Sequence, residues 1–166
     1  MTGAPVADAG RGPLALGVVV LLVGFVLDQL TKLWVLFQTD LPDGAVIHVA
    51  PFVDFTLVWN RGISYGLMQQ DSEFGRWVLV VFSIVAVVAL SVWMWRTDRK
   101  LIAVSLALIV GGALGNLVDR VAYGAVVDFI YLHAFGYSWY VFNLADTWIV
   151  AGVAGLLYDS FKPGSG

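Results

Sequence analysis

Four charged residues near the ends of apolar segments are the first candidates for chemistry: Asp119, Arg120, Asp128 and Asp146. Carboxylates and a guanidinium are costly in or near hydrocarbon, so each of them calls for a function or a partner. Two carboxylates a few ångströms apart cannot both ionise cheaply, so such a pair shares one proton near neutral pH. One carboxylate can then activate water while the other donates a proton. We interpret Asp128 as one half of a proteolytic pair.

The sequence around Asp128 predicts that it lies apart from the charged residues that precede it. Asn116, Asp119 and Arg120 stand at positions i, i+3 and i+4 and therefore share one helix face. Asp119 and Asp128 are nine residues apart, which in a continuous helix would place them on opposite sides. Gly124 permits a break that re-aims the chain. We therefore predict different roles for the two carboxylates, with Asp119 in support.

The elements that must position these residues are membrane helices. The chain has 166 residues, of which 60% are hydrophobic and only 13% are charged, a composition that predicts an integral membrane protein. We expect one all-α membrane domain over residues 1–166, with spans near residues 14–37, 77–95, 101–120 and 141–158. The net charge is -3 without a basic run, so nucleic-acid binding is not expected.

Cofactor chemistry finds little support in the sequence. The chain has no cysteine, which excludes disulfides, thiolate nucleophiles and cysteine-ligated metals. His48 and His133 match no metal-binding spacing, so we expect neither a metal nor another cofactor.

The distribution of basic residues predicts the orientation in the membrane. Arg11, Lys162 and the loop from Arg96 to Lys100 carry more positive charge than the opposite side, where Arg61, Arg76 and Arg120 lie. Basic residues favour the cytoplasmic side, so both termini are expected in the cytoplasm. An even number of spans agrees with this prediction.

A second kind of structure is expected over residues 40–71. Val53, Phe55, Leu57 and Trp59 recur at period two, which indicates a strand. Residues 60–62 form a turn signal, and residues 63–66 could return as a short strand or an extended edge. Strands with open edges do not occur in hydrocarbon, so this small platform is expected at the interface or along a protein cavity, where it could hold an extended peptide. Residues 129–140 are aromatic and suit an interfacial stretch.

Polar groups from three spans converge at one depth. Asp28 and Lys32 lie four apart in the first span and can pair. Asn143 is a plausible N-cap for the fourth span, with Asp146 in its first turn, and a simple capping role fits both. With cytoplasmic termini, these residues and Asp128 all fall in the outer part of the membrane. Capping alone predicts no such convergence.

The ordered set of these motifs resembles the bacterial lipoprotein signal peptidases, also called signal peptidase II, which are aspartic peptidases of the inner membrane. The resemblance covers nearly the whole chain. Its loop motif matches at residues 60–62, whereas residues 63–66 depart from the commoner small-residue continuation. The other matching segments are DQLTK at residues 28–32, GGALGN at 111–116 with Asp119 and Arg120, VDF at 127–129 and FNLAD at 142–146.

The resemblance implies the roles of particular residues. It assigns Asp128 and Asp146 as the catalytic dyad. The substrate it implies is a prolipoprotein whose signal peptide is a membrane helix and whose cysteine bears a diacylglyceryl group, cleaved on the N-terminal side of that cysteine. We expect the enzyme to act as a monomer in the bilayer, with its active site near the extracytoplasmic face. Supporting or substrate-contacting positions are Asp28, Lys32, Asn60, Gly62, Asn116, Asp119, Arg120, Asn143 and Ala145.

Two other classes of function compete with this hypothesis. A small proton-coupled transporter or channel subunit would use the aspartates as a proton relay, although four spans without inverted repeats do not suit most transporters. A structural assembly protein would use the polar groups to join helices, but has no reason to place two carboxylates where water arrives. The Gly-x-Gly-Asp motif of other intramembrane aspartic peptidases is absent from the sequence.

Overall fold

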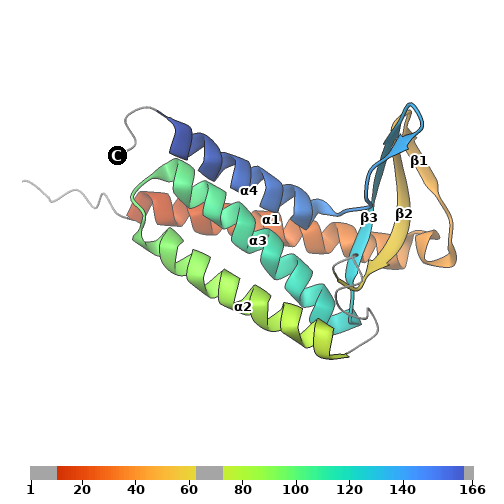
Figure 1. Cartoon of the computed structure of the whole chain (residues 1–166), viewed down its shortest axis with the longest axis horizontal. Helices are drawn as coiled ribbons and strands as arrows, with labels where there is room; N and C mark the ends of the chain where they lie inside the picture. The colour runs from red at the N-terminus through yellow and green to blue at the C-terminus, as the bar shows by residue number, and fades with distance from the viewer. Residues whose placement is uncertain (1–10, 63–72, 163–166) are drawn as a thin grey trace, which may run out of the picture.

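The computed structural model describes residues 11–62 and 73–162. Within these ranges four long helices lie side by side, and a small sheet stands at one end of the bundle (Figure 1). The sheet is four-stranded with the order β1-β2-β3-β4. The elements are α1 (Arg11–Gln38), η1 (Leu41–Asp43), β1 (Ile47–Ala50), β2 (Val53–Asn60), α2 (Glu73–Arg96), α3 (Lys100–Tyr123), β3 (Val126–Ala134), β4 (Tyr137–Ser138) and α4 (Leu144–Phe161).

Helix α3 is the centre of the bundle. It packs against α1, α2 and α4, and it has the largest share of buried side chains among the helices. Its glycines allow the neighbouring helices to approach its backbone, as small residues do in membrane proteins. A β-carbon at Gly112 would collide with the carbonyl oxygen of Ala145 in α4, and one at Gly111 would lie 3.0 Å from the carbonyl oxygen of Leu21 in α1. The glycine-rich half of α3 is therefore packing surface.

This packing gives a first testable expectation. We expect Gly112→Ala to force α3 and α4 apart and to lower the free energy of unfolding by about 1–3 kcal/mol, the usual cost of overpacking. Gly24→Ala is the matched control, because its new methyl group would lie 3.6 Å from Trp148, an ordinary contact. Thermal melting in detergent compares the two. Equal melting temperatures for both variants would contradict the close α3–α4 approach.

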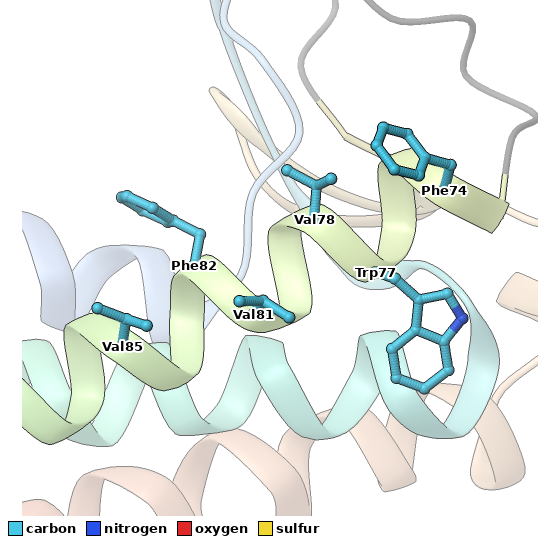
Figure 2. Close-up of a pocket in the computed structure, with 6 residues that line it drawn as sticks. All are labelled: Phe74, Trp77, Val78, Val81, Phe82 and Val85. Carbon is cyan, nitrogen blue, oxygen red and sulfur yellow. The ribbon is translucent and has the colours of Figure 1, made fainter.

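Three of the helices are long and apolar enough to cross a membrane in the described part of the chain: α1, α2 and α3. Helix α4 is shorter, with 18 residues, and carries Asp146 and Asp159 near its two ends. Its crossing of the membrane stays a prediction. Helix α2 turns an apolar stripe away from α3, where Phe74, Val78 and Phe82 line an open groove of about 530 Å³ (Figure 2). This face suits contact with lipid chains.

The predicted break after α3 is confirmed. The helix ends at Tyr123, and Gly124 adopts a φ of 77°, with its N–H donating to the carbonyl oxygen of Arg120. A left-handed residue after the last turn is a common helix terminator, and glycine takes it without strain. The chain then turns directly into β3, so Asp119 and Asp128 fall in different elements.

The sheet differs from the predicted platform in its pairing. Strand β2 matches the alternating residues 53–59, but its antiparallel partners are β1 and β3. The prediction that residues 63–66 return as an edge concerns a segment outside the described residues. Residues 129–140, expected as an interfacial stretch, lie largely in strands, because Val126–Ala134 forms β3 and Tyr137–Ser138 forms β4, and their interfacial location stays a prediction. Pairing with β2, 66 or more residues away, supplies the hydrogen bonds that make this segment a strand.

Candidate active site

Asp128 lies in β3 and is held by two asparagines. Its Oδ2 accepts from Asn60 Nδ2 at 2.9 Å, and its Oδ1 accepts from Asn143 Nδ2 at 2.6 Å. Asn60 closes β2, and Asn143 precedes α4. Only 1% of the surface of Asp128 is exposed to solvent, although its carboxyl group can ionise. Three elements distant in sequence therefore converge on this one carboxyl group.

Asp146 lies in the first turn of α4. Its Oδ2 accepts from the backbone N–H of Asn143 at 3.2 Å, and its own N–H donates to Asn143 Oδ1 at 3.0 Å, which completes a capping box. The predicted N-cap is confirmed. The other carboxylate oxygen, Oδ1, accepts from Asn116 Nδ2 at 2.9 Å. Asp146 thus caps a helix and also faces the polar cluster on α3.

Asn116 and Asn143 connect the two aspartates. Asn143 Nδ2 donates both to Asp128 and, at 3.1 Å, to Asn116 Oδ1, while the amide nitrogen of Asn116 donates to Asp146. Each amide has its carbonyl oxygen and its nitrogen committed to fixed partners, so neither can turn over without losing two hydrogen bonds. The relative position of Asp128 and Asp146 is set by this pair of asparagines.

A buried lysine anchors the same network. Lys32 Nζ contacts Asp28 Oδ2 at 2.9 Å, Asp119 Oδ2 at 2.8 Å and Asn116 Oδ1 at 3.0 Å. All three donors of the ammonium group are used, and both carboxylates are nine-tenths or more buried. The contact with Asn116 orients the amide that meets Asp146. The predicted Asp28–Lys32 pair is present, with Asp119 as an additional partner.

Asp119 and Asp28, the two carboxylates that contact Lys32, also accept hydrogen bonds from the backbone. Asp119 Oδ2 accepts from the N–H of Val127, the residue before Asp128, at 3.1 Å. Asp28 Oδ1 accepts from the N–H of Ala145, the residue before Asp146, at 2.9 Å. The two carboxylates around Lys32 therefore hold the chain directly before each proposed catalytic aspartate. Asp119 therefore belongs to the group around Lys32, and the support role expected for it stays a prediction.

The remaining predicted positions lie around the network. Arg120 is within electrostatic range of Asp146, Asp128 and Asp119, and its Nη1 donates to the carbonyl oxygen of Asn116 at 3.3 Å. Its buried Nε finds no hydrogen-bond partner among the residues that the structure describes. Gly62 has a φ of 140°, and its N–H donates to Asn60 Oδ1 at 3.1 Å. Gly62 thus orients the amide of Asn60 and does not itself reach Asp128.

The environment of Asp128 changes its acidity. Burial raises the pKa of this carboxyl to about 7, the nearby charge of Asp146 adds to the rise, and the hydrogen bonds from Asn60 and Asn143 oppose it. Removal from water disfavours the charged form of a carboxyl group. Asp128 can therefore carry a proton near neutral pH. Within the described ranges no group of three histidine or acidic side chains could hold a metal ion.

Two sets of residues were missed by the sequence analysis. Gln29 Nε2 donates to Asp28 Oδ2, to Asp119 Oδ1 and to the Gly115 carbonyl oxygen at 3.2–3.3 Å. It therefore binds both carboxylates that contact Lys32. Its place between Asp28 and Lys32 in the first motif was the available signal. His48, Asp54 and His133 form a separate cluster on the sheet. Only the pairing of three strands brings these three together, so no local spacing could reveal them.

Known proteins resemble this chain in sequence over most of its length. A family model described as signal peptidase (SPase) II matches residues 20–162. The lipoprotein signal peptidase of Methylorubrum extorquens is 58% identical over 147 residues, which are 89% of this chain and 86% of that protein. The protein of the same name from Rhodopseudomonas palustris is 53% identical over 152 residues, 89% of this chain and 93% of that protein.

The fold is also shared with a solved structure. A bacterial membrane enzyme solved at 1.9 Å resolution superposes with a TM-score of 0.78 and 27% sequence identity, over 90% of this chain and 94% of that one. The family model spans nearly the whole chain, and the relatives are more than half identical over most of its length. This chain therefore belongs to the signal peptidase II family, the membrane-embedded peptidases that process bacterial lipoproteins.

Proposed function

We propose that this chain is an aspartic endopeptidase that removes the signal peptide from diacylglyceryl-modified prolipoproteins, with Asp128 and Asp146 as its catalytic pair. The observation that carries the proposal is the shared orientation of the two carboxylates by Asn116 and Asn143. A pair of acids held this way can act on one water molecule. A proton relay would require no such fixed pair.

The chemistry needs one proton between the two acids. The ionised member accepts a proton from a bound water as the water attacks the scissile carbonyl, and the protonated member donates to the developing oxyanion. When the tetrahedral intermediate collapses and its C–N bond breaks, the acid that took the proton of water gives it to the leaving nitrogen, and the other acid takes back a proton from a hydroxyl of the intermediate, so the pair regains its first state. Asp128 has a pKa of about 7, which suits it to hold the proton in the resting state. Arg120 would limit the negative charge of the pair as these steps proceed.

The membrane setting determines how the substrate arrives. With both termini in the cytoplasm, the outer ends of α3 and α4, the sheet and the two aspartates lie near the extracytoplasmic face. The signal helix and the diacylglyceryl chains would then approach through the bilayer, while water enters from outside. Strand β2 and its neighbours would hold the extended residues near the cut. One chain contains the complete network, so we propose that it acts as a monomer.

Cleavage of two forms of one precursor tests the proposal. In liposomes, the protein is expected to cleave a prolipoprotein whose cysteine bears diacylglycerol, and to cleave the unlipidated precursor at least about 100-fold more slowly in kcat/KM, because binding energy from the lipid positions the peptide. The cleaved bond is located by mass spectrometry. Cleavage of both forms at equal rates would refute the substrate assignment, and proton flux without cleavage would favour a transporter.

A further inference from the structure

A second polar cluster lies on the sheet, outside the network of the aspartates. Asp54 of β2 accepts from His48 Nδ1 of β1 at 2.8 Å and from His133 Nε2 of β3 at 3.0 Å. Asp54 is 8% exposed, whereas 81% of the His48 side chain is exposed. We call His48, Asp54 and His133 the clasp. It joins three strands through one buried carboxylate. It has no role in the peptidase chemistry proposed above.

The clasp and the proposed active site lie at opposite ends of the same pair of strands. Strands β2 and β3 are joined by side chains twice, by Asp54 with His133 at one end and by Asn60 with Asp128 at the other. His133 is five residues beyond Asp128 along β3, which is about 17 Å in an extended strand. The two joints therefore fix the same strand pair from its two ends.

Between the two joints the ladder is irregular. The register is continuous from Val53 to Phe55, shifts between Phe55 and Val58, and then continues to Asn60. An extra residue in one strand weakens local pairing and allows it to adjust. A slip of one residue would reverse the direction of every side chain beyond it. Asn60 would then no longer point at Asp128, so the register beyond the irregularity needs a second constraint.

We propose that Asp54 is a positioning residue for the peptidase reaction. By binding His48 and His133 it fixes the register of β2 on β3, and through that register it keeps the Asn60 amide on the Asp128 carboxyl. This inference rests on the proposed role of Asp128. It adds Asp54, a residue at the far end of the strand pair from Asp128, to those that the reaction needs. His48 extends the same constraint to β1, an edge strand of the sheet.

Asp54 keeps its charge in the clasp below neutral pH. The hydrogen bond from His48 holds the pKa of Asp54 below its usual range, so this carboxylate stays ionised well below neutral pH and loses its stabilising effect only as the pH falls through that lowered pKa. An ionised acceptor makes a stronger hydrogen bond than a neutral one, which strengthens both contacts of the clasp.

Steady-state kinetics test the positioning role. We expect Asp54→Asn to lower kcat about tenfold, with KM changed less than about twofold, because a small displacement of a catalytic group mainly slows the chemical step. Asp43→Asn removes an exposed carboxylate from a neighbouring element and should leave kcat unchanged. A merely structural role would lower the melting temperature without this selective loss of kcat, and that result would overturn the proposal.

A double mutant identifies the route of the effect. If Asp54 acts through Asn60, then adding Asp54→Asn to Asn60→Ala should cost less than about twofold in kcat, because the contact it protects is already lost. Independent, multiplicative losses in the double variant would contradict the proposed route.

A crosslink tests the register without any enzyme assay. The chain has no cysteine, so Val53→Cys with Leu132→Cys introduces one reporter pair at residues that face each other across β2 and β3. We expect this pair to oxidise rapidly in the parent protein and about tenfold more slowly with Asp54→Asn added. Equal rates would overturn the clasp even if cleavage proceeds as proposed. A slower rate would support the clasp even if the proposed cleavage fails.

Discussion

Replacing Asp128 with asparagine is expected to lower kcat by about 10³-fold or more, because the pair then loses the group that holds and returns its proton. Asp146→Asn should be as severe, since the two acids share the same proton. The measurement is single-turnover cleavage of the lipidated precursor, with thermal melting to show that each variant is folded. Asp98→Asn, in the exposed loop before α3, is the matched control and should retain full activity.

The pH dependence should distinguish Asp128 from its neighbours. Its pKa is raised from 3.8 to about 7, so the protonated form stabilises the folded protein below pH 3.8 and this contribution is lost as the pH rises through 7. A rise of this size corresponds to about 4 kcal/mol at most. We therefore expect the melting temperature of the wild type to fall between pH 5 and pH 8, and Asp128→Asn to remove that slope.

The same titration should appear in the activity. Deprotonation of Asp128 above pH 7 leaves the pair without its proton, so kcat should fall on the alkaline side. Either folded dyad variant with turnover near that of the wild type would refute the assignment of the pair.

Lys32→Met is expected to have the largest effect on stability. It removes the cation between Asp28 and Asp119 and leaves two buried carboxylates without their partner, which typically costs about 3–5 kcal/mol. For a protein of this size we expect the melting temperature to fall by about 10 °C. Lys100→Met, at an exposed position at the start of α3, is the matched control.

A compensating variant makes the Lys32 prediction specific. Adding Asp119→Asn to Lys32→Met removes one of the two unpaired charges, so it should restore part of the lost stability although it deletes a further ionic group. Activity should stay low in the double variant, because Asn116 has still lost the ammonium group that orients its amide. A double variant less stable than Lys32→Met alone would contradict the anchoring role.

Much of the helical architecture was predictable because the bilayer restricts it so strongly. Apolar runs of sufficient length indicated all four helices, although the fourth is confirmed as a helix and not as a membrane span. Gly124 marked the end of α3 correctly, since a left-handed residue there favours glycine. The convergence of Asp128, Asp146 and Asn116 was also expected, because all of them end spans on the same side. Their roles in catalysis stay predictions.

The sheet was predicted less well. Residues 53–59 show the alternation of a strand, but strand order depends on partners that are distant in sequence and leave no local signal. Val126–Ala134 is a strand because β2 supplies its hydrogen bonds, and its aromatic residues alone suited an interfacial stretch equally well.

Local composition and spacing were enough to predict the membrane environment, the helices, the break after α3 and the list of polar residues. The partners of those polar residues became visible only in the folded chain. It placed Asp119 with Lys32 and Asp128 with Asn60 and Asn143, and it joined His48 and His133 through Asp54. The reason is physical: a buried charge is satisfied by whichever partner the packing of distant elements brings within hydrogen-bond reach.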